Sequence, residues 1–321
     1  MITVRRLNIR QITKNQLSVY THLVKPGFID IYNETNLLDP KDKSLTVYVA
    51  EEGEKPVGLL VTSCMPENKI LQIKVLNTLP GDQSADIRQK LLDFMTQEAI
   101  KKKFQTLLAV YPNEGPFLEE WEQLFIQNQW DGKKLVMIEC FYADCQQFHP
   151  PWFDKNYQLD PSYEIFPWSE LTQKDKESIV QAWENGAIPQ NVYPFSGNAL
   201  FEPITSLGLR HKGGVVAWVI NRVAANNTLC YQSIFSDYDL QKKGHAIVLL
   251  IESIKRQQQL SPFKSSVFQI NITYVRQAWV TFVRRRSAPY ATKVIEYYQA
   301  WRQLPPDCKP ENQKNSPNVT R

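Results

Sequence analysis

The stretch of the chain with the clearest chemical character is a pair of lysines followed by a glycine. It consists of Gln241, Lys242, Lys243, Gly244, His245 and Ala246. A loop that opens a helix exposes unpaired backbone N–H groups at the positive end of the helix dipole. Gly244 lets the backbone approach a ligand closely, and the lysines add positive charge. The stretch therefore predicts a site for a diphosphate group.

The elements that must position this loop are strands and helices in alternation. In the second half of the chain, the hydrophobic pattern predicts strands over Tyr163–Phe166, Val215–Asn221, Thr228–Ser236, Ser265–Tyr274 and Ile295–Leu304. Helices are predicted over Lys174–Glu184, Gly244–Gln259 and Arg276–Arg285. The lysine–glycine loop thus joins a strand to a helix.

The first half of the chain has the same order of elements. Strands are predicted over Thr3–Leu7, Thr46–Ala50, Pro56–Thr62, Ile70–Leu76, Gln105–Tyr111 and Lys134–Tyr142. Helices are predicted over Ile12–Val24, Ser84–Lys103 and Phe117–Gln129. The repetition indicates an α/β (α+β) protein built by domain duplication.

These patterns divide the chain into four parts. We expect one domain over residues 1–144 and a second over residues 162–304. Residues 145–161 contain three prolines and are expected to form a linker or an ordered bridge. The polar end, residues 305–321, is expected to be disordered.

The loop and its setting resemble the GNAT family, the GCN5-related N-acyltransferases. The acyl-CoA loop of that family reads Gln/Arg-x-x-Gly-x-Gly/Ala between a strand and a helix, and Gln241, Gly244 and Ala246 complete this pattern. The resemblance covers residues 163–304 with the motif and residues 1–143 by the order of elements. It implies two tandem GNAT-like domains, each a mixed, mostly antiparallel central sheet flanked by helices.

The resemblance also implies where the ligands bind. The strand before the loop is expected to splay from its neighbour, and the pantetheine arm of acetyl-CoA or a longer acyl-CoA to run along Ile234, Phe235 and Ser236. The pyrophosphate is expected on residues 241–246, without a metal. An amine acceptor is expected to enter from the other side of the sheet and to attack the thioester, helped by a general base and a general acid.

The chain departs from the family at the catalytic groups. The family motif Asn-x-x-Ala-x-x-x-Tyr, whose tyrosine protonates the thiol, is replaced by Val275, Ala278 and Phe282. Phe282 is therefore expected to line the cofactor site without acting as an acid. Tyr274 is a substitute candidate for the acid; the alternative is that this tyrosine only packs at the sheet edge. Asp237 and Asp239 are candidates for the base; the alternative is that they stabilise a turn or cap a helix.

His245 and the first half of the chain complete this interpretation. The histidine is expected to face solvent or phosphate. In the first half, Asp86 is expected where Gly244 stands in the second. A carboxylate at a helix start repels a diphosphate and can cap the N–H groups itself. The first domain is therefore expected to be degenerate and to serve as a scaffold or to complete the acceptor site.

Two further groups of residues have both a functional and a purely structural interpretation. Arg284, Arg285 and Arg286 suit a solvated helix end, or a contact for the CoA 3′-phosphate or an acidic carrier protein. The aromatic residues Trp183, Tyr193, Phe195 and Phe201 suit packing beneath a long loop, or an acyl or peptide groove.

Composition excludes several other classes of protein. A net charge of +4 over 321 residues is too mild for a nucleic-acid binder, and the apolar runs are too short for a membrane span. The five scattered cysteines do not form a disulfide framework, and Cys145 with His149 lacks the second pair that a metal site needs. The N-terminus has no secretory apolar region, so we expect a cytoplasmic protein.

The function predicted from the resemblance is that of an N-acyltransferase. It would move an acyl group from an acyl-CoA or acyl-carrier-protein thioester to a primary amine of a small molecule or peptide. A lysine or ornithine side chain of a ribosomal peptide natural product, with a fatty acyl donor, is one option. The alternative is a non-catalytic GNAT-like binding or scaffold module, which the absent tyrosine and asparagine favour.

Overall fold

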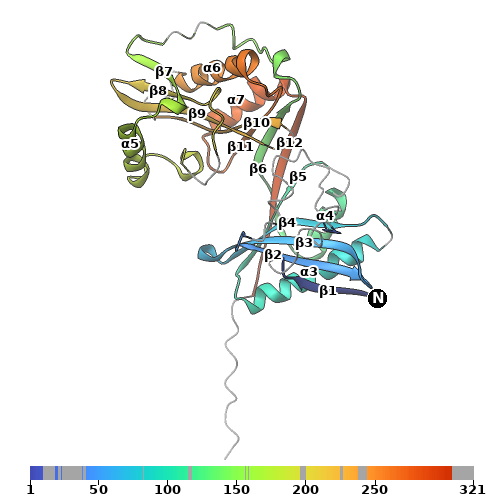
Figure 1. Ribbon diagram of the computed structural model, residues 1–321. Helices are drawn as coiled ribbons and strands as arrows, with labels where there is room; N and C mark the ends of the chain where they lie inside the picture. Colours follow the sequence, from blue (N-terminus) through green and yellow to red (C-terminus); the bar gives the residue numbers. More distant parts are fainter. Residues whose placement is uncertain are drawn as a thin grey trace, which may run out of the picture. The chain divides into compact units, whose positions relative to one another are not determined.

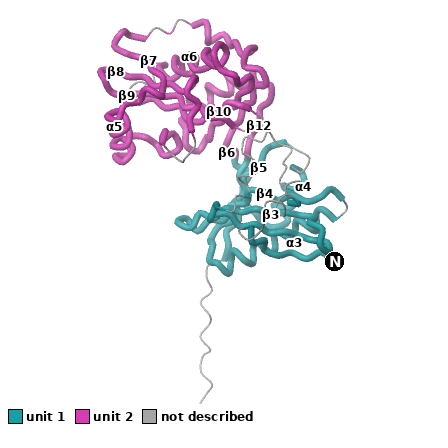
Figure 2. Tube along the Cα trace, viewed as in Figure 1, with its two compact units in different colours: residues 1–28, 34–134, 298–321 teal, residues 29–33, 135–297 magenta. Residues whose placement is uncertain are grey.

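The computed structural model describes residues 1–9, 19, 20, 23, 38, 41–81, 83–114, 118–155, 157, 159–195, 200–224, 227–237 and 244–305. Two compact units divide the chain (Figure 2). Unit 1 comprises Met1–Phe28, Glu34–Lys134 and Tyr298–Arg321, and unit 2 comprises Ile29–Asn33 and Leu135–Tyr297.

Unit 1 is a mostly antiparallel sheet covered by helices (Figure 1). Its strands are β1 (Ile2–Leu7), β2 (Leu45–Glu52), β3 (Lys55–Met65), β4 (Ile70–Thr78) and β5 (Thr106–Pro112), which pair in this order. Its helices are α3 (Ser84–Lys101) and α4 (Leu118–Gln127). The apolar stripe of α3 is buried, with Leu91, Leu92 and Met95 fully inaccessible. The expected helix over Ile12–Val24 lies largely outside the described residues.

Unit 2 contains a second, similar set of neighbouring strands. Its strands are β7 (Tyr163–Pro167), β8 (Leu207–His211), β9 (Gly214–Val223), β10 (Thr228–Ser236), β11 (Ser265–Asn271) and most of β6 (Asp131–Tyr142), in the order β6-β11-β10-β9-β8-β7. Its helices are α5 (Gln173–Glu184), α6 (His245–Leu260) and α7 (Gln277–Phe282), the last continued by a π-turn over Val283–Ser287. Strand β8 was not predicted, because its five residues are short and include a glycine.

Two cores lie on the two faces of the unit 2 sheet. On one face, α6 packs through Leu249, Leu250 and Ile254 on β8, β9 and β10. On the other face, Ile179 of α5 packs with Phe166 and Trp218. A capping box fixes the start of α5, because Thr172 Oγ1 accepts from Asp175 N and the Asp175 carboxylate accepts from Thr172 N.

Most of the last strand of the first half of the sequence, and the end of the last strand of the second half, belong to the unit formed mainly by the other half. Strand β6, predicted to close the first half, pairs with β11 of unit 2 over Met137–Tyr142. Strand β12 (Lys293–Gln303), predicted to close the second half, ends in unit 1, where Leu304 N donates to Gln105 O at 2.8 Å. Strand pattern predicts a strand but not its partner, so the sequence carried no sign of this exchange.

Residues 145–155, at the start of the expected linker or bridge (the bridge segment), pack against α6 within unit 2. Gln258 Nε2 of α6 donates to Cys145 O at 2.7 Å and to Phe148 O at 3.0 Å. The side chains of Phe148, Trp152 and Phe153 are buried in the core beneath α6. No described helix combines the length and hydropathy that a membrane span requires.

Candidate functional site

A cavity of about 360 Å³ opens in unit 2 where β10 ends and α6 begins. Its lining residues come from the end of β10, the first turn of α6, the segment around α7 and the loop after α5. They are Ala187, Pro189, Asn191, Val192, Ile234, Phe235, Ser236, Gly244, Ala246, Ile247, Tyr274, Val275, Arg276, Ala278, Trp279 and Phe282. The cavity therefore brings most of the predicted site residues together.

The cavity exists because two neighbouring strands separate. Strand β10 pairs with β11 in parallel only from Thr228 to Tyr231. On its other edge β10 continues to pair with β9 up to Ser236, after a register shift between Tyr231 and Ser233. Beyond Tyr231, the edge of β10 that faces β11 has no described strand beside it. This edge offers backbone N–H and C=O groups to an extended ligand.

Gly244 provides the backbone turn that opens α6. It is the N-cap of the helix, with φ 77° and ψ 10°, in the left-handed region that favours glycine. A Cβ at this position would lie 3.9 Å from the Tyr157 ring, which is ordinary contact. Backbone conformation rather than crowding therefore requires glycine here. The N–H groups of the first turn of α6 follow it directly, beside Ala246 in the cavity wall.

The remaining loop residues divide into two groups. Gln241, Lys242 and Lys243 lie outside the described residues. His245 is 6% exposed, and its ring lies 4.5 Å from that of Tyr163. The expectation that His245 faces solvent or phosphate is therefore wrong, because the first turn of α6 directs the ring toward β7. Tyr163 also stacks on His211 at 4.3 Å.

The opposite wall is formed by the segment around α7. Phe282 lies in the cavity lining, and its ring meets Trp279 and Trp152 edge to face at 5.4 Å and 5.3 Å. Tyr274 also lines the cavity and is 66% exposed. It lies in the turn after β11 rather than in the strand, because β11 ends at Asn271. Arg276, the N-cap of α7, supplies the only cation among the described lining residues.

Asp237 and the arginine run lie apart from the cavity lining. Asp237 follows β10, and its backbone N donates to Val216 O at 2.9 Å. Arg284 forms an ion pair with Glu296 at 2.8 Å, and Arg286 O accepts from Trp152 Nε1 at 2.7 Å. The arginines therefore stand in a turn that is tied to the bridge segment.

The loop after α5 forms a further wall, through Ala187, Pro189, Asn191 and Val192. Val192 O accepts from Ser233 Oγ at 2.8 Å and from Trp218 Nε1 at 3.2 Å, which fixes the loop against β10. Trp183 stacks on Tyr193 at 4.5 Å, and Phe195 packs near Trp168. These aromatic residues pack beneath the loop and are not among those that line the cavity. Of the two interpretations given for them, packing beneath the loop is therefore the one that the structure shows.

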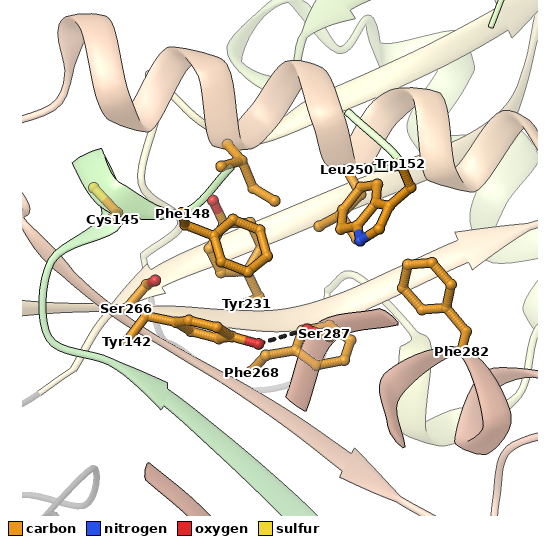
Figure 3. A pocket seen from close by; sticks show the side chains of 11 residues that line it. Tyr142, Cys145, Phe148, Trp152, Tyr231, Leu250, Ser266, Phe268, Phe282 and Ser287 are labelled. Atoms are coloured by element: carbon orange, nitrogen blue, oxygen red, sulfur yellow. Dashed lines mark hydrogen bonds between the residues drawn. The ribbon is translucent and has the colours of Figure 1, made fainter. Parts of the chain in front are cut away.

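A small apolar cavity of about 30 Å³ lies behind Phe282 (Figure 3). Tyr142, Phe148, Trp152 and Phe282 stand around it below α6, and Tyr142 Oη lies 2.5 Å from Ser287 Oγ. Phe282 thus lines both this cavity and the larger one. The smaller cavity holds about one water-sized group.

Unit 1 lacks the features of this site. Its loop between β4 and α3 has five residues, whereas the loop between β10 and α6 has eight. The N-cap residue of α3, which corresponds to Gly244 at the start of α6, is Gln83. Asp86, which was expected at this position, lies three residues further along the chain. The Asp86 carboxylate pairs with Lys90 at 2.8 Å instead of capping the helix. Between α3 and α4, the buried Arg88 guanidinium contacts Glu120.

Metal chemistry has no candidate in the described part of the chain. No group of three or more His, Cys, Asp or Glu residues gathers there as metal ligands. The four described cysteines, Cys64, Cys140, Cys145 and Cys230, are free thiols.

Comparison with known proteins gives structural matches only. No protein-family model and no curated protein matches the sequence. A tandem GNAT protein from the clavulanic acid biosynthesis pathway is similar over 96% of this chain and all of its own, with a TM-score of 0.65 and 12% identity. A GCN5-related N-acetyltransferase from Sphaerobacter thermophilus covers 95% of this chain and 97% of its own, with a TM-score of 0.60 and 10% identity.

A third match is a part of a larger protein. A GCN5-related glucosamine N-acetyltransferase region of a fungal multi-domain β-N-acetylglucosaminidase is similar over 94% of this chain and 38% of its own, with a TM-score of 0.62 and 13% identity. The fold expected from the acyl-CoA loop is thereby confirmed. The chain has the tandem fold of the GCN5-related N-acetyltransferases.

Proposed function

We propose that the protein is an N-acyltransferase that moves an acyl group from a CoA thioester to a primary amine. The observation that carries the proposal is the left-handed Gly244 at the start of α6, set beside the open edge of β10 in one cavity. A bare scaffold has no need for a helix N-terminus that opens onto such an edge.

The donor would bind along this wall. The diphosphate would take the N–H groups of the first turn of α6, with Gln241, Lys242 and Lys243 nearby in the sequence. The pantetheine amides would pair with the backbone of Ile234, Phe235 and Ser236, on the edge that β11 leaves open. Phe282 would pack beside the thioester end. Arg276 and the arginines after α7 offer cations to the 3′-phosphate or to a carrier-protein donor.

The chemistry that this arrangement supports is direct transfer. The acceptor nitrogen attacks the thioester carbonyl, the C–S bond breaks, and the acyl group becomes an amide. One proton leaves the nitrogen and one is taken by the thiolate. Tyr274 lines the cavity and remains our candidate for the acid, whereas Asp237 remains a candidate base that the cavity lining does not include. Water can take either role.

The two units would have different roles. Unit 2 would bind the donor, while unit 1 would serve as a degenerate scaffold, because the loop before α3 is shorter than the loop before α6 and the N-cap of α3 is Gln83 rather than glycine. The free thiols of the described cysteines agree with a cytoplasmic protein.

The alternative is a non-catalytic GNAT-like binding module, which the phenylalanine at position 282 favours. Thermal unfolding with CoA, acetyl-CoA and decanoyl-CoA separates the two, because a ligand of the folded state raises the melting temperature. We expect a shift that depends on concentration and differs between the thioesters. The transfer activity is then assayed on amines, including lysine and ornithine peptides, by mass spectrometry.

The matched variants are Gly244→Glu and Gly53→Glu. Both glycines have positive φ, 77° and 63°, and nothing lies within 4 Å of a Cβ at Gly53. Both variants therefore carry a similar backbone cost of about 1–2 kcal/mol. Only Gly244→Glu should lose the CoA-induced shift, because its carboxylate repels the diphosphate. Equal CoA shifts in the two variants, or none in the unaltered protein, would refute the donor site.

A further inference from the structure

A second cavity of about 260 Å³ adjoins the first at the point where β10 and β11 separate. It shares Asn191, Val192 and Ile234 with the donor cavity. None of the described residues that line it is charged. Four of them have carboxamide side chains, namely Asn191, Gln232, Gln269 and Asn271. A neutral cavity with several hydrogen-bonding groups is suited to a polar ligand.

Glu139 stands directly behind one of these carboxamides. It lies on β6 opposite Gln269 of β11 in the strand register, so both side chains point to the same face of the sheet. Met137, two residues earlier on that face of β6, lines the cavity. Gln269 Nε2 donates to Glu139 Oε2 at 2.7 Å, and Tyr297 Oη donates to the same oxygen at 3.4 Å.

The carboxylate of Glu139 is buried rather than presented to the ligand. The residue is 0% exposed, and its Oε1 has no hydrogen-bond partner within the described part of the chain. The pKa of Glu139 is raised above its ordinary value, because the effect of burial outweighs the opposite effects of the hydrogen bonds from Gln269 and Tyr297 and of the nearby Lys293 charge. A side chain so enclosed acts on the cavity through the residue that it holds.

The bond to Glu139 fixes the orientation of the Gln269 amide. Gln269 Nε2 donates to Glu139 Oε2, so the amide turns its NH₂ toward Glu139. The carbonyl oxygen of Gln269 then remains for the cavity. Asn271 is fixed in the opposite sense, because its Oδ1 accepts from Thr273 N at 3.1 Å and its NH₂ remains. The cavity thus presents an oriented acceptor and an oriented donor.

We propose that Gln269, positioned by Glu139, recognises the acceptor of the acyl transfer as a primary aliphatic amine by accepting a hydrogen bond from its nitrogen. This inference rests on the proposed function, since the cavity opens beside the donor site. A neutral carbonyl suits the task better than a carboxylate. The carbonyl of Gln269 accepts a hydrogen bond without placing a carboxylate in direct contact with the nitrogen.

The test compares two cationic probes at pH 7.5, hexylamine and N,N,N-trimethylhexylammonium, by ligand-observed NMR titration of the full chain with and without CoA. Both carry one positive charge, but only the primary amine has N–H groups that can donate hydrogen bonds. We expect the unaltered protein to bind the amine about tenfold more tightly, a difference of about 1.4 kcal/mol. Gln269→Leu should bring the ratio close to one. Glu139→Gln frees the amide to turn over, and should reduce the ratio to about two or less.

Gln127→Leu, an exposed glutamine on α4 of unit 1, is the matched control and should keep the tenfold preference. A merely structural role for Glu139 would lower stability without changing the ratio. The inference is overturned if the unaltered protein binds both probes equally or binds neither, or if either variant keeps the preference. The CoA-induced thermal shift is measured in a separate experiment. If that shift is absent, the proposed donor site is wrong, but the preference for the amine can still be measured by NMR.

Discussion

The substitution Asp175→Asn should destabilise unit 2 through the charge that it removes. Asp175 is 6% exposed, and its Oδ2 accepts from Thr172 N at 3.0 Å, Thr172 Oγ1 at 2.8 Å and Arg210 Nη2 at 2.9 Å. Asparagine keeps the size of the side chain and an acceptor oxygen. The substitution therefore isolates the electrostatic contribution to the start of α5, the helix that leads into the cavity wall.

The expected magnitude follows from these bonds. Hydrogen bonds to charged groups contribute about 1.5–3 kcal/mol, and those between neutral groups contribute about 0.5–1.5 kcal/mol. Replacing the first kind by the second should lower the free energy of unfolding by about 1–2 kcal/mol, which is a factor of about 5–30 in the folded-to-unfolded ratio. Asp93→Asn, at an exposed aspartate of α3 that accepts from Gln89 Nε2 at 2.8 Å, is the control and should change stability by less than about 0.5 kcal/mol.

The effect should also depend on pH. Burial alone would raise the pKa of Asp175, but the hydrogen bonds from Arg210 and Thr172 and the Arg210 charge hold it below its ordinary value of 3.8. A carboxyl group with a lowered folded pKa stabilises the protein above its unfolded pKa, and this contribution is lost as the pH falls through the folded pKa. The gap between the two proteins should be full at pH 7 and should narrow below about pH 4.

Urea titration followed by tryptophan fluorescence measures this, because Trp183 lies on α5 itself and Trp168 just before it. The experiment is run at pH 7, 5, 4 and 3.5 on the unaltered protein, Asp175→Asn and the control. Two results would refute the reasoning. One is equal stability of Asp175→Asn and the unaltered protein at pH 7, and the other is a gap that stays constant down to pH 3.5.

Three further predictions concern other parts of unit 2 and the cysteines. Trp218→Phe removes the donor that binds Val192 O and Ser233 Oγ, so it should cost about 1 kcal/mol and speed hydrogen exchange at residues 190–193; unchanged exchange would contradict this. Burial raises the pKa of Glu139 in the folded state, so the unaltered protein should lose stability as the pH rises from 4 to 7. Glu139→Gln lacks this titrating group, and its stability should therefore rise relative to that of the unaltered protein over the same range. Urea denaturation of both proteins at pH 4 and pH 7 tests the sign. Burial raises the pKa of Cys140 and Cys230 to about 12 and that of Cys145 to about 11, so among the described cysteines iodoacetamide should modify Cys64 first, as peptide mapping would show.

The sequence was most informative where local pattern determines the structure. The helix over Ser84–Lys101 and the hairpin of β9 and β10 were predicted within a few residues, because apolar periodicity and turn residues specify them. Gly244 was also identifiable, from the pattern that it forms with Gln241 and Ala246, although its positive φ became visible only in the structure.

What the sequence could not give were features set by distant partners. The burial of His245 depends on Tyr163 of β7, far away in the chain. The wall around Val192 depends on a hydrogen bond from Trp218, and the role of Gln269 on a carboxylate from β6. None of these pairings has a spacing that a single sequence reveals. Tyr274 was misplaced by a smaller error, because β11 stops before the residue.

The exchange of β6 and β12 between the units affects how the chain folds during its synthesis on the ribosome. The part of unit 1 that lies before residue 134 is synthesised first, but its last strand arrives only with residues 298–303. At about 5–20 residues per second, that interval is on the order of ten seconds or more. During this time the nascent first unit carries an unpaired strand edge, which is a template for intermolecular pairing. Synthesis rate and chaperone occupancy would therefore govern the yield of folded protein, and a late stop codon would damage the unit made first.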